Sequence, residues 1–304
     1  MKLIKPRALR PGDKIGVVAT AGAVDPDELR RGVEAVSARG FEVELSRGLT
    51  EKKGYLAGSE ELRAQALEEF FLRPDIKAIF CARGGFGSAQ LLPLLDPARL
   101  RFSAKIFVGF SDVTVLVNWL AQRGRFVTFH GPMVAMDIAR GLTGRTKEFF
   151  WRTLSGEQSN WEIGPLRSVQ KGLAQGELAG GCLSLLVTTL GTPYEIETKD
   201  KVLFIEDVGE KPYRIERMLT HLKMAGKFAG IRGLIFGHFA GCEGNGEREL
   251  SDIIGELFER APYPVVWGFP AGHGDENLLV PIGARVTVDG TRGVVSLVEA
   301  PVET

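Results

Sequence analysis

The 304-residue sequence has few cysteines and no surplus of charge of either sign. Its three cysteines, Cys81, Cys182 and Cys242, are scattered without CxxC spacing, which argues against a disulfide framework and a zinc ribbon. Basic and acidic residues number 38 each, with no long run of one sign, so the basic surface typical of nucleic-acid-binding proteins is missing. We therefore expect a small-molecule or peptide partner and no nucleic acid.

Long apolar segments are also absent. The N-terminal stretch MKLIKPRALRPGDKIGVV has no apolar run long enough for a signal peptide, and no uncharged run elsewhere is long enough to span a bilayer. These features predict a cytoplasmic protein with no membrane partner. The residues are 44% hydrophobic and 25% charged, as in ordinary globular proteins, and the length favours two domains.

The first part of the chain alternates short β-rich runs with amphipathic segments. This alternation predicts an α/β domain over 1–136, built on a mostly parallel sheet with helices on both faces. Ligands of such sheets bind beyond the carboxyl ends of the strands. The predicted strands are 15–19, 42–45, 78–81, 106–108 and 126–129, and the predicted helices are 26–39, 60–71, 88–95 and 113–122.

The later part of the chain has a different pattern. Residues 137–170 lose the strand signal, carry one predicted helix at 146–154, and are expected to be a linker. Residues 171–304 contain shorter, glycine-punctuated pieces with alternation near the end, which predicts a smaller, β-rich α+β domain with a curved or barrel-like sheet. Its predicted strands include 201–207 and 233–237, and its predicted helices are 213–225 and 250–260.

The segment KIFVGFSDVTVLVNWL places Ser111 in a turn between a predicted strand and a predicted helix. A nucleophile elbow needs this context, because a sharp turn exposes the hydroxyl above the sheet. The pattern is GxSD, whereas α/β-hydrolases have GxSxG. Ser111 and Asp112 are also good helix N-caps, so the residues alone leave both interpretations open.

The segment CARGGFGSAQLL also follows a strand and precedes a helix. One interpretation is an oxyanion hole, in which the N–H groups of Gly85 and Asp112 converge on one carbonyl oxygen. The alternatives are a tight turn or a phosphate-binding loop, although the lysine of a P-loop is missing. The segment by itself does not decide between them.

A serine nucleophile needs a base and a group that orients it. Of the four histidines, His273 lies in GHGDEN, a loop rich in glycine and in acidic and amide residues, where a positioned side chain is more expected than core packing. The segment VLFIEDVGE places Glu206 and Asp207 at the end of a predicted strand. The other three histidines, His130, His221 and His238, are consistent with strand-end, helical or core positions.

Several of these motifs together resemble the LD-carboxypeptidase family of serine peptidases, the muramoyl-tetrapeptide carboxypeptidases, which are related to microcin C self-immunity proteins. The motifs ARGGFG, GFSD, HGPM, GGCLSLL, IEDVGEKPYRIERML and GHGDENLLVPIG occur in the family's order over nearly the whole chain. One departure is Cys182, where the family pattern leads us to expect asparagine. The resemblance implies an amidotransferase-like first domain followed by a smaller β-rich domain.

The resemblance also implies the site and its chemistry. Ser111 would be the nucleophile, His273 the general base and Glu206 the carboxylate that orients it, with the oxyanion held by N–H groups of Gly85 and Asp112. The reaction would remove the terminal D-alanine from murein tetrapeptides in peptidoglycan recycling, without metal or cofactor, in a homodimer. An exopeptidase must also bind a free carboxylate, for which we expect an arginine. The candidates are Arg83 and Arg214.

Two other functions remain open on the sequence alone. The first is hydrolysis of peptidyl nucleotides, as in the microcin C immunity proteins, with Trp151 and Trp161 as a platform for the base. These tryptophans would equally suit packing at a domain junction. The second is a non-catalytic, two-domain protein that binds a small molecule, which reactivity of Ser111 towards a fluorophosphonate would exclude.

Overall fold

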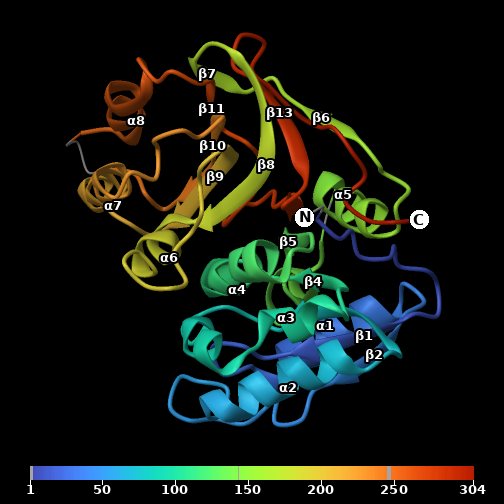
Figure 1. The fold of residues 1–304 in the computed structure, drawn as a ribbon. Helices are drawn as coiled ribbons and strands as arrows, with labels where there is room; N and C mark the ends of the chain where they lie inside the picture. Colours follow the sequence, from blue (N-terminus) through green and yellow to red (C-terminus); the bar gives the residue numbers. More distant parts are fainter. Residues whose placement is uncertain (1–2, 143, 245–247) are drawn as a thin grey trace. The chain divides into compact units, whose positions relative to one another are not determined.

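The computed structural model describes residues 3–142, 144–244 and 248–304, which form two compact units (Figure 1). The first unit takes in the described residues of 1–158 together with 278–281 and 301–304. The second takes in the described residues of 159–277 and 282–300. The expected linker, 137–170, is therefore divided between the two units.

The first unit is built on a six-stranded sheet in the order β12-β5-β4-β3-β1-β2. The pairs from β2 through β5 are parallel. Strands β1, β3, β4 and β5 are mostly buried, as expected where helices cover both faces of a sheet, whereas the edge strand β2, with the sequence EVEL, has no buried residue. The strands are β1 (Lys14–Val18), β2 (Glu42–Leu45), β3 (Ile76–Cys81), β4 (Ile106–Val108), β5 (Thr128–His130) and β12 (Val280–Ile282).

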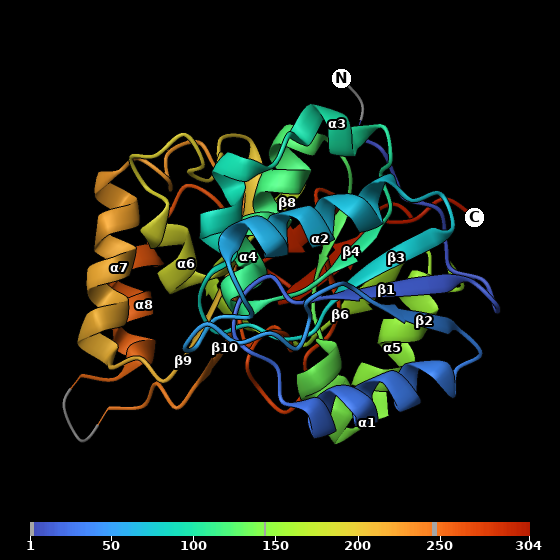
Figure 2. The same ribbon diagram turned by 90° about the horizontal axis from the view of Figure 1, so that it is seen from below.

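Helices α1 and α2 lie on opposite faces of this sheet (Figure 2). The side chain of Asp25 caps α1 and that of Ser59 caps α2, each by accepting hydrogen bonds from backbone N–H groups of the first turn. The helical segments are α1 (Pro26–Ser37), α2 (Glu60–Leu72), η1 (Ser88–Leu94), α3 (Pro97–Arg101), η2 (Ser111–Val113), α4 (Thr114–Trp119), η3 (Leu120–Gly124), η4 (Val134–Ile138) and α5 (Gly144–Leu154).

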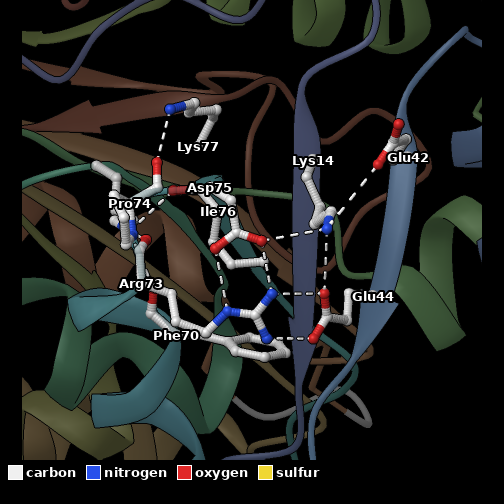
Figure 3. A network of polar contacts seen from close by, with 10 residues as sticks. Lys14, Glu42, Glu44, Phe70, Arg73, Pro74, Asp75, Ile76 and Lys77 are labelled. Atoms are coloured by element: carbon white, nitrogen blue, oxygen red, sulfur yellow. Dashed lines mark hydrogen bonds and ion pairs between the residues drawn. The ribbon is translucent and has the colours of Figure 1, made fainter.

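A network of ion pairs lies at the amino ends of β1 and β3 (Figure 3). The guanidinium of Arg73 binds both Glu44 and Asp75, and the ammonium of Lys14 lies 3.1 Å from Asp75. These charges are partly exposed, so their main effect is to fix the end of α2 against the strands. The network lies at the edge of the sheet opposite to the carboxyl ends, where ligands of parallel sheets bind.

The second unit is built on an eight-stranded mixed sheet in the order β6-β14-β13-β8-β9-β10-β11-β7. Its four central strands, β8 to β11, are parallel, and the outer pairs are antiparallel. The strands are β6 (Trp161–Ile163), β7 (Arg167–Gln170), β8 (Leu173–Cys182), β9 (Lys201–Val208), β10 (Gly233–Ala240), β11 (Val265–Trp267), β13 (Arg285–Asp289) and β14 (Val294–Leu297).

Helices α6 (Leu183–Thr188), α7 (Pro212–Met224) and α8 (Leu250–Phe258) complete the second unit. Their apolar side chains pack against β9 and β10 in one core, which includes Leu219, Phe236 and Ile254. Two sheets with accompanying helices confirm the predicted fold class. No helix within the described residues is long and apolar enough to cross a membrane.

Candidate active site

Ser111 lies in the sharp turn that follows β4 and is the first residue of η2. It is one of the few residues other than glycine with a positive φ, +60°, a conformation that costs energy and is retained mainly where function requires it. The turn also needs glycine at position 109, because a Cβ there would lie 2.7 Å from Val113 and 3.1 Å from the sulfur of Cys81. The local geometry is therefore that of a nucleophile elbow.

The loop 84–88 lies directly across this turn. A Cβ at Gly84 would be 3.0 Å from the Cβ and 3.1 Å from the Oγ of Ser111, so an alanine here would require a shift of a few tenths of an ångström. At the other end of the loop, the backbone N–H of Ser88 donates to the buried carboxylate of Asp112 at 2.8 Å. Gly85, with φ of +113°, is exposed between these two contacts. The predicted oxyanion-hole residues Gly85 and Asp112 thus belong to neighbouring segments of one unit.

The two candidate arginines have different surroundings. Arg83 directly precedes Gly84, is half-buried, and donates from Nη1 to the carbonyl of Ala23 at 3.0 Å. Its buried Nε has no hydrogen-bond partner among the described residues. Arg214 is exposed at the start of α7 and lies 3.5 Å from the carboxylate of Glu210. Arg83 therefore lies beside the Ser111 turn, whereas Arg214 contacts its own helix and the preceding loop.

In the second unit, Glu206 and His273 form a direct pair. Glu206, fully buried at the end of β9, accepts from the His273 backbone N–H at 3.2 Å, and its Oε2 lies 2.7 Å from Nδ1 of the ring. A carboxylate at this position favours the tautomer with the proton on Nδ1, which leaves the lone pair on Nε2. This is the arrangement that a general base of the predicted kind requires.

Glycines let the His273 loop lie close to the strand ends. Gly272 has φ of +107°, and a Cβ there would be 2.5 Å from Oε2 of Glu206. A Cβ at Gly274 would be 2.5 Å from the ring of His238 on β10. The backbone N–H of Gly272 also donates to the side chain of Asn277 at 3.0 Å. Asn277 thus closes the loop, a contact that no local sequence pattern predicted.

Asp207, next to Glu206, fixes the start of α6. Its buried carboxylate accepts from the backbone N–H of Ser184 at 2.9 Å and lies 3.5 Å from the sulfur of Cys182. Burial raises the pKa of the Cys182 thiol well above its usual range, with the carboxylates of Glu206 and Asp207 acting in the same direction. Cys182 is therefore a buried, protonated thiol at the position where asparagine was expected.

His130, His221 and the two tryptophans considered for nucleobase binding lie in buried or helical positions. His130 is buried with its ring 5.6 Å from that of Phe110, and His221 is exposed on α7. Trp151 and Trp161 are 7% and 6% exposed and pack within their own units, so neither presents an open ring face for a nucleobase. Across the described residues, no group of three or more His, Cys, Asp or Glu side chains is arranged to hold a metal ion.

Comparison with known proteins agrees with these features. The LD-carboxypeptidase N-terminal domain model matches residues 15–131, and the C-terminal domain model matches residues 175–288. A probable murein peptide carboxypeptidase of Bacillus subtilis is 38% identical, over 98% of this chain and 95% of the relative. The microcin C7 self-immunity protein MccF of Escherichia coli is 29% identical, over 96% of this chain and 94% of MccF.

The solved structures show the same relationship. The crystal structure of muramoyltetrapeptide carboxypeptidase from Oxalobacter formigenes superposes with a TM-score of 0.85 at 31% identity. The match covers 93% of this chain and 97% of the other. The resemblance read from the sequence motifs is confirmed.

Proposed function

Because this chain belongs to the LD-carboxypeptidase family, we propose that it is a serine carboxypeptidase that releases the terminal D-alanine from murein tetrapeptides. The observation that carries the proposal is the buried Glu206 carboxylate bound to Nδ1 of His273. In a family of serine peptidases, such a pair serves to activate a hydroxyl nucleophile. The nucleophile that we assign is Ser111, on its strained turn.

The reaction follows from these roles. Oγ of Ser111 attacks the carbonyl carbon of the diamino acid that precedes D-alanine, while Nε2 of His273 takes the hydroxyl proton. N–H groups of Gly85 and Asp112 donate to the oxyanion. The C–N bond then breaks, and D-alanine leaves with the proton from His273. Water, deprotonated by His273, hydrolyses the acyl-enzyme and restores Ser111.

The C-terminal carboxylate of the substrate requires a cation, and we assign this role to Arg83 in preference to Arg214. Arg83 is next to Gly84, which contacts Ser111, and its guanidinium contacts a neutral carbonyl. Arg214 already has an acidic partner in Glu210. A guanidinium that lacks a carboxylate partner retains more of its capacity to bind one from the substrate.

We propose that this reaction takes place in the cytoplasm as part of peptidoglycan recycling, in a homodimer, and without nucleic-acid or membrane partners. The support is the similarity of this chain to proteins named as murein peptide and murein tetrapeptide carboxypeptidases. No step of the mechanism above needs a metal or an organic cofactor.

The experiment that tests the function measures D-alanine release from a tetrapeptide ending in diaminopimelate-D-alanine. The wild-type protein should release D-alanine, whereas Ser111→Ala should not, and a peptide ending in L-alanine should resist both. If the folded wild-type protein releases no D-alanine but hydrolyses an aminoacyl sulfamoyl adenosine, the peptidyl-nucleotide function replaces the proposal. The buried positions of Trp151 and Trp161 lead us to expect the first result.

A further inference from the structure

Two aromatic side chains, Tyr55 and Phe86, are exposed beside the Ser111 turn. Tyr55 is 70% exposed and Phe86 is 50% exposed, and their rings contact each other edge to face at 5.9 Å. The two residues come from different loops of the first unit, and neither ring is part of the core. Exposed aromatic clusters of this kind often mark a ligand-binding surface, because water solvates the rings poorly.

The loop that carries Phe86 contacts the Ser111 turn on both sides of Phe86. Phe86 lies two residues after Gly84, which contacts Ser111, and two residues before Ser88, which donates to Asp112. It also directly follows Gly85, whose N–H we assign to the oxyanion hole. The Cα of Phe86 therefore lies one residue, about 3.8 Å, from that of Gly85 in the loop that contacts the Ser111 turn.

The loop that carries Tyr55 is bonded to the same framework. The N–H of Ala23 donates to the carbonyl of Tyr55 at 2.9 Å, and the N–H of Gly22 donates to the carbonyl of Gly84 at 3.1 Å. Residues 22–23 thus connect the Tyr55 loop to the loop of Phe86.

Arg63 holds this framework rigid. Its side chain is 2% exposed and donates to the carbonyls of Thr20 at 2.6 Å and Gly87 at 2.9 Å, and to the side chain of Gln90 at 2.6 Å. A buried guanidinium that satisfies backbone carbonyls on two loops fixes their separation, since moving either loop would leave a buried charge without partners. The two rings therefore form a preorganised surface.

We propose that Tyr55 and Phe86 form the subsite for the side chain of the diamino acid whose carbonyl is attacked, an inference that rests on the proposed carboxypeptidase function. That residue is the one next to the oxyanion hole. Its methylenes pack on the ring faces, and its terminal ammonium is attracted to the electron-rich π faces. The leaving D-alanine has only a methyl group, which is too small to cover two rings.

The sugar of a muropeptide is a less suitable occupant of these rings. It is separated from the diamino acid by two further residues, so it lies roughly 10 Å or more from the scissile bond in an extended peptide. Phe86 belongs to the proposed oxyanion loop itself, one residue after Gly85, and its ring contacts that of Tyr55. The position of the aromatic pair therefore selects the diamino acid over the glycan.

The test compares two tetrapeptides ending in D-alanine, one with lysine and one with alanine as the residue before it. We measure the ratio of their kcat/KM values for the wild type and for Phe86→Leu and Tyr55→Leu. The lysine-to-alanine ratio should fall about tenfold in Phe86→Leu and about threefold in Tyr55→Leu, as expected for lost aromatic contacts to an alkylammonium chain. The matched control is Phe102→Leu, because Phe102 is 90% exposed at the opposite edge of the same unit, and its ratio should not change.

A purely structural role of the rings would lower both kcat/KM values alike, and that result, or an unchanged ratio, overturns the inference. Calorimetric binding of the same peptides to Ser111→Ala and to Ser111→Ala/Phe86→Leu separates this inference from the proposed function. If the wild type releases no D-alanine, the function is wrong. A tenfold fall in the lysine-to-alanine affinity ratio still supports the subsite, and the lack of such a fall overturns it.

Discussion

The position of the His273 side chain depends on the neighbouring glycine, Gly272, because a larger residue there would not fit. Gly272 lies between the strand end and the base, and any Cβ there would meet the Glu206 carboxylate at 2.5 Å. The Glu206 carboxylate and the His273 imidazole are only 2.7 Å apart, so the carboxylate cannot move away from such a contact without disturbing this hydrogen bond. The orientation of the proposed base is therefore set by backbone packing as much as by the hydrogen bond.

We predict that Gly272→Ala lowers kcat/KM for D-alanine release by about 100-fold, the scale expected when a catalytic group is misplaced by about 1 Å. The matched control is Gly268→Ala, since Gly268 also has a positive φ but nothing within 4 Å of its Cβ position. Backbone strain should lower the melting temperature in both variants. Equal activity of the two variants would show that the Gly272 contact does not position Glu206.

A pH prediction follows from Asp112. Burial raises the pKa of this carboxyl above its ordinary 3.8, and the hydrogen bonds from the Ser88 and Gly87 backbone oppose the shift without cancelling it. The folded state then binds the proton more tightly than the unfolded state, so the contribution of Asp112 to stability falls as the pH rises above 3.8.

Urea unfolding of the wild type and Asp112→Asn from about pH 4 to about pH 8 measures this contribution. The free energy of unfolding of the wild type, relative to Asp112→Asn, should decline with rising pH, because asparagine keeps an acceptor for Ser88 but does not ionise. A relative stability that rises with pH would mean that the folded state favours the ionised carboxylate instead.

Some residues of the proposed site could be predicted from the sequence, and others could not, for a physical reason. Ser111 and Glu206 could be proposed because each follows a predicted strand, and His273 because it lies in a glycine-rich polar loop, all within a longer set of family motifs. Arg63 has no such signal: it lies on a helix, and its acceptors Thr20 and Gly87 are 43 and 24 residues away. Contacts at such separations are set by the folded sheet and not by a local pattern.

At the scale of elements, most helices and strands were predictable from periodicity. The strands 42–45 and 106–108 have the predicted bounds, and the other predicted strands differ by a few residues. Helix α6 was missed because its six residues, LSLLVT, are too short to show a helical period. Its start is set by Asp207 on β9, which accepts from Ser184 across 23 residues of sequence.

We predict that Asp207→Ala destabilises the protein by about 1–2 kcal/mol, the usual loss when a helix N-terminal acceptor is removed. The N–H groups of Ser184 and Val208 would lose their buried acceptor. The control is Asp289→Ala, because Asp289 accepts from Thr291 and Arg292 in an exposed turn where water replaces it. A smaller loss of melting temperature in Asp207→Ala than in Asp289→Ala would contradict this role of the Asp207 carboxylate.

At the scale of the whole molecule, the chain returns to its first unit twice after leaving it. Leu279, beside β12, packs on Gly131, and Glu303 exchanges backbone hydrogen bonds with Pro6 and Ala8. Domains predicted from the sequence were contiguous stretches, because nothing in the local sequence indicates that a later segment packs back on the first unit. These two segments return because β12 pairs with β5 and Glu303 pairs with Arg7, in both cases across more than 140 residues of sequence.

The central claim is that Ser111 is a nucleophile activated by the Glu206–His273 pair. The most direct measurement is covalent labelling by a fluorophosphonate, with the modified residue located by mass spectrometry of peptides. We expect one label, on Ser111, in the wild type, and at least about 100-fold slower labelling in His273→Ala and Glu206→Ala with the fold retained. Labelling of Ser111 at the same rate in all three proteins, or a label on another residue, would contradict the claim.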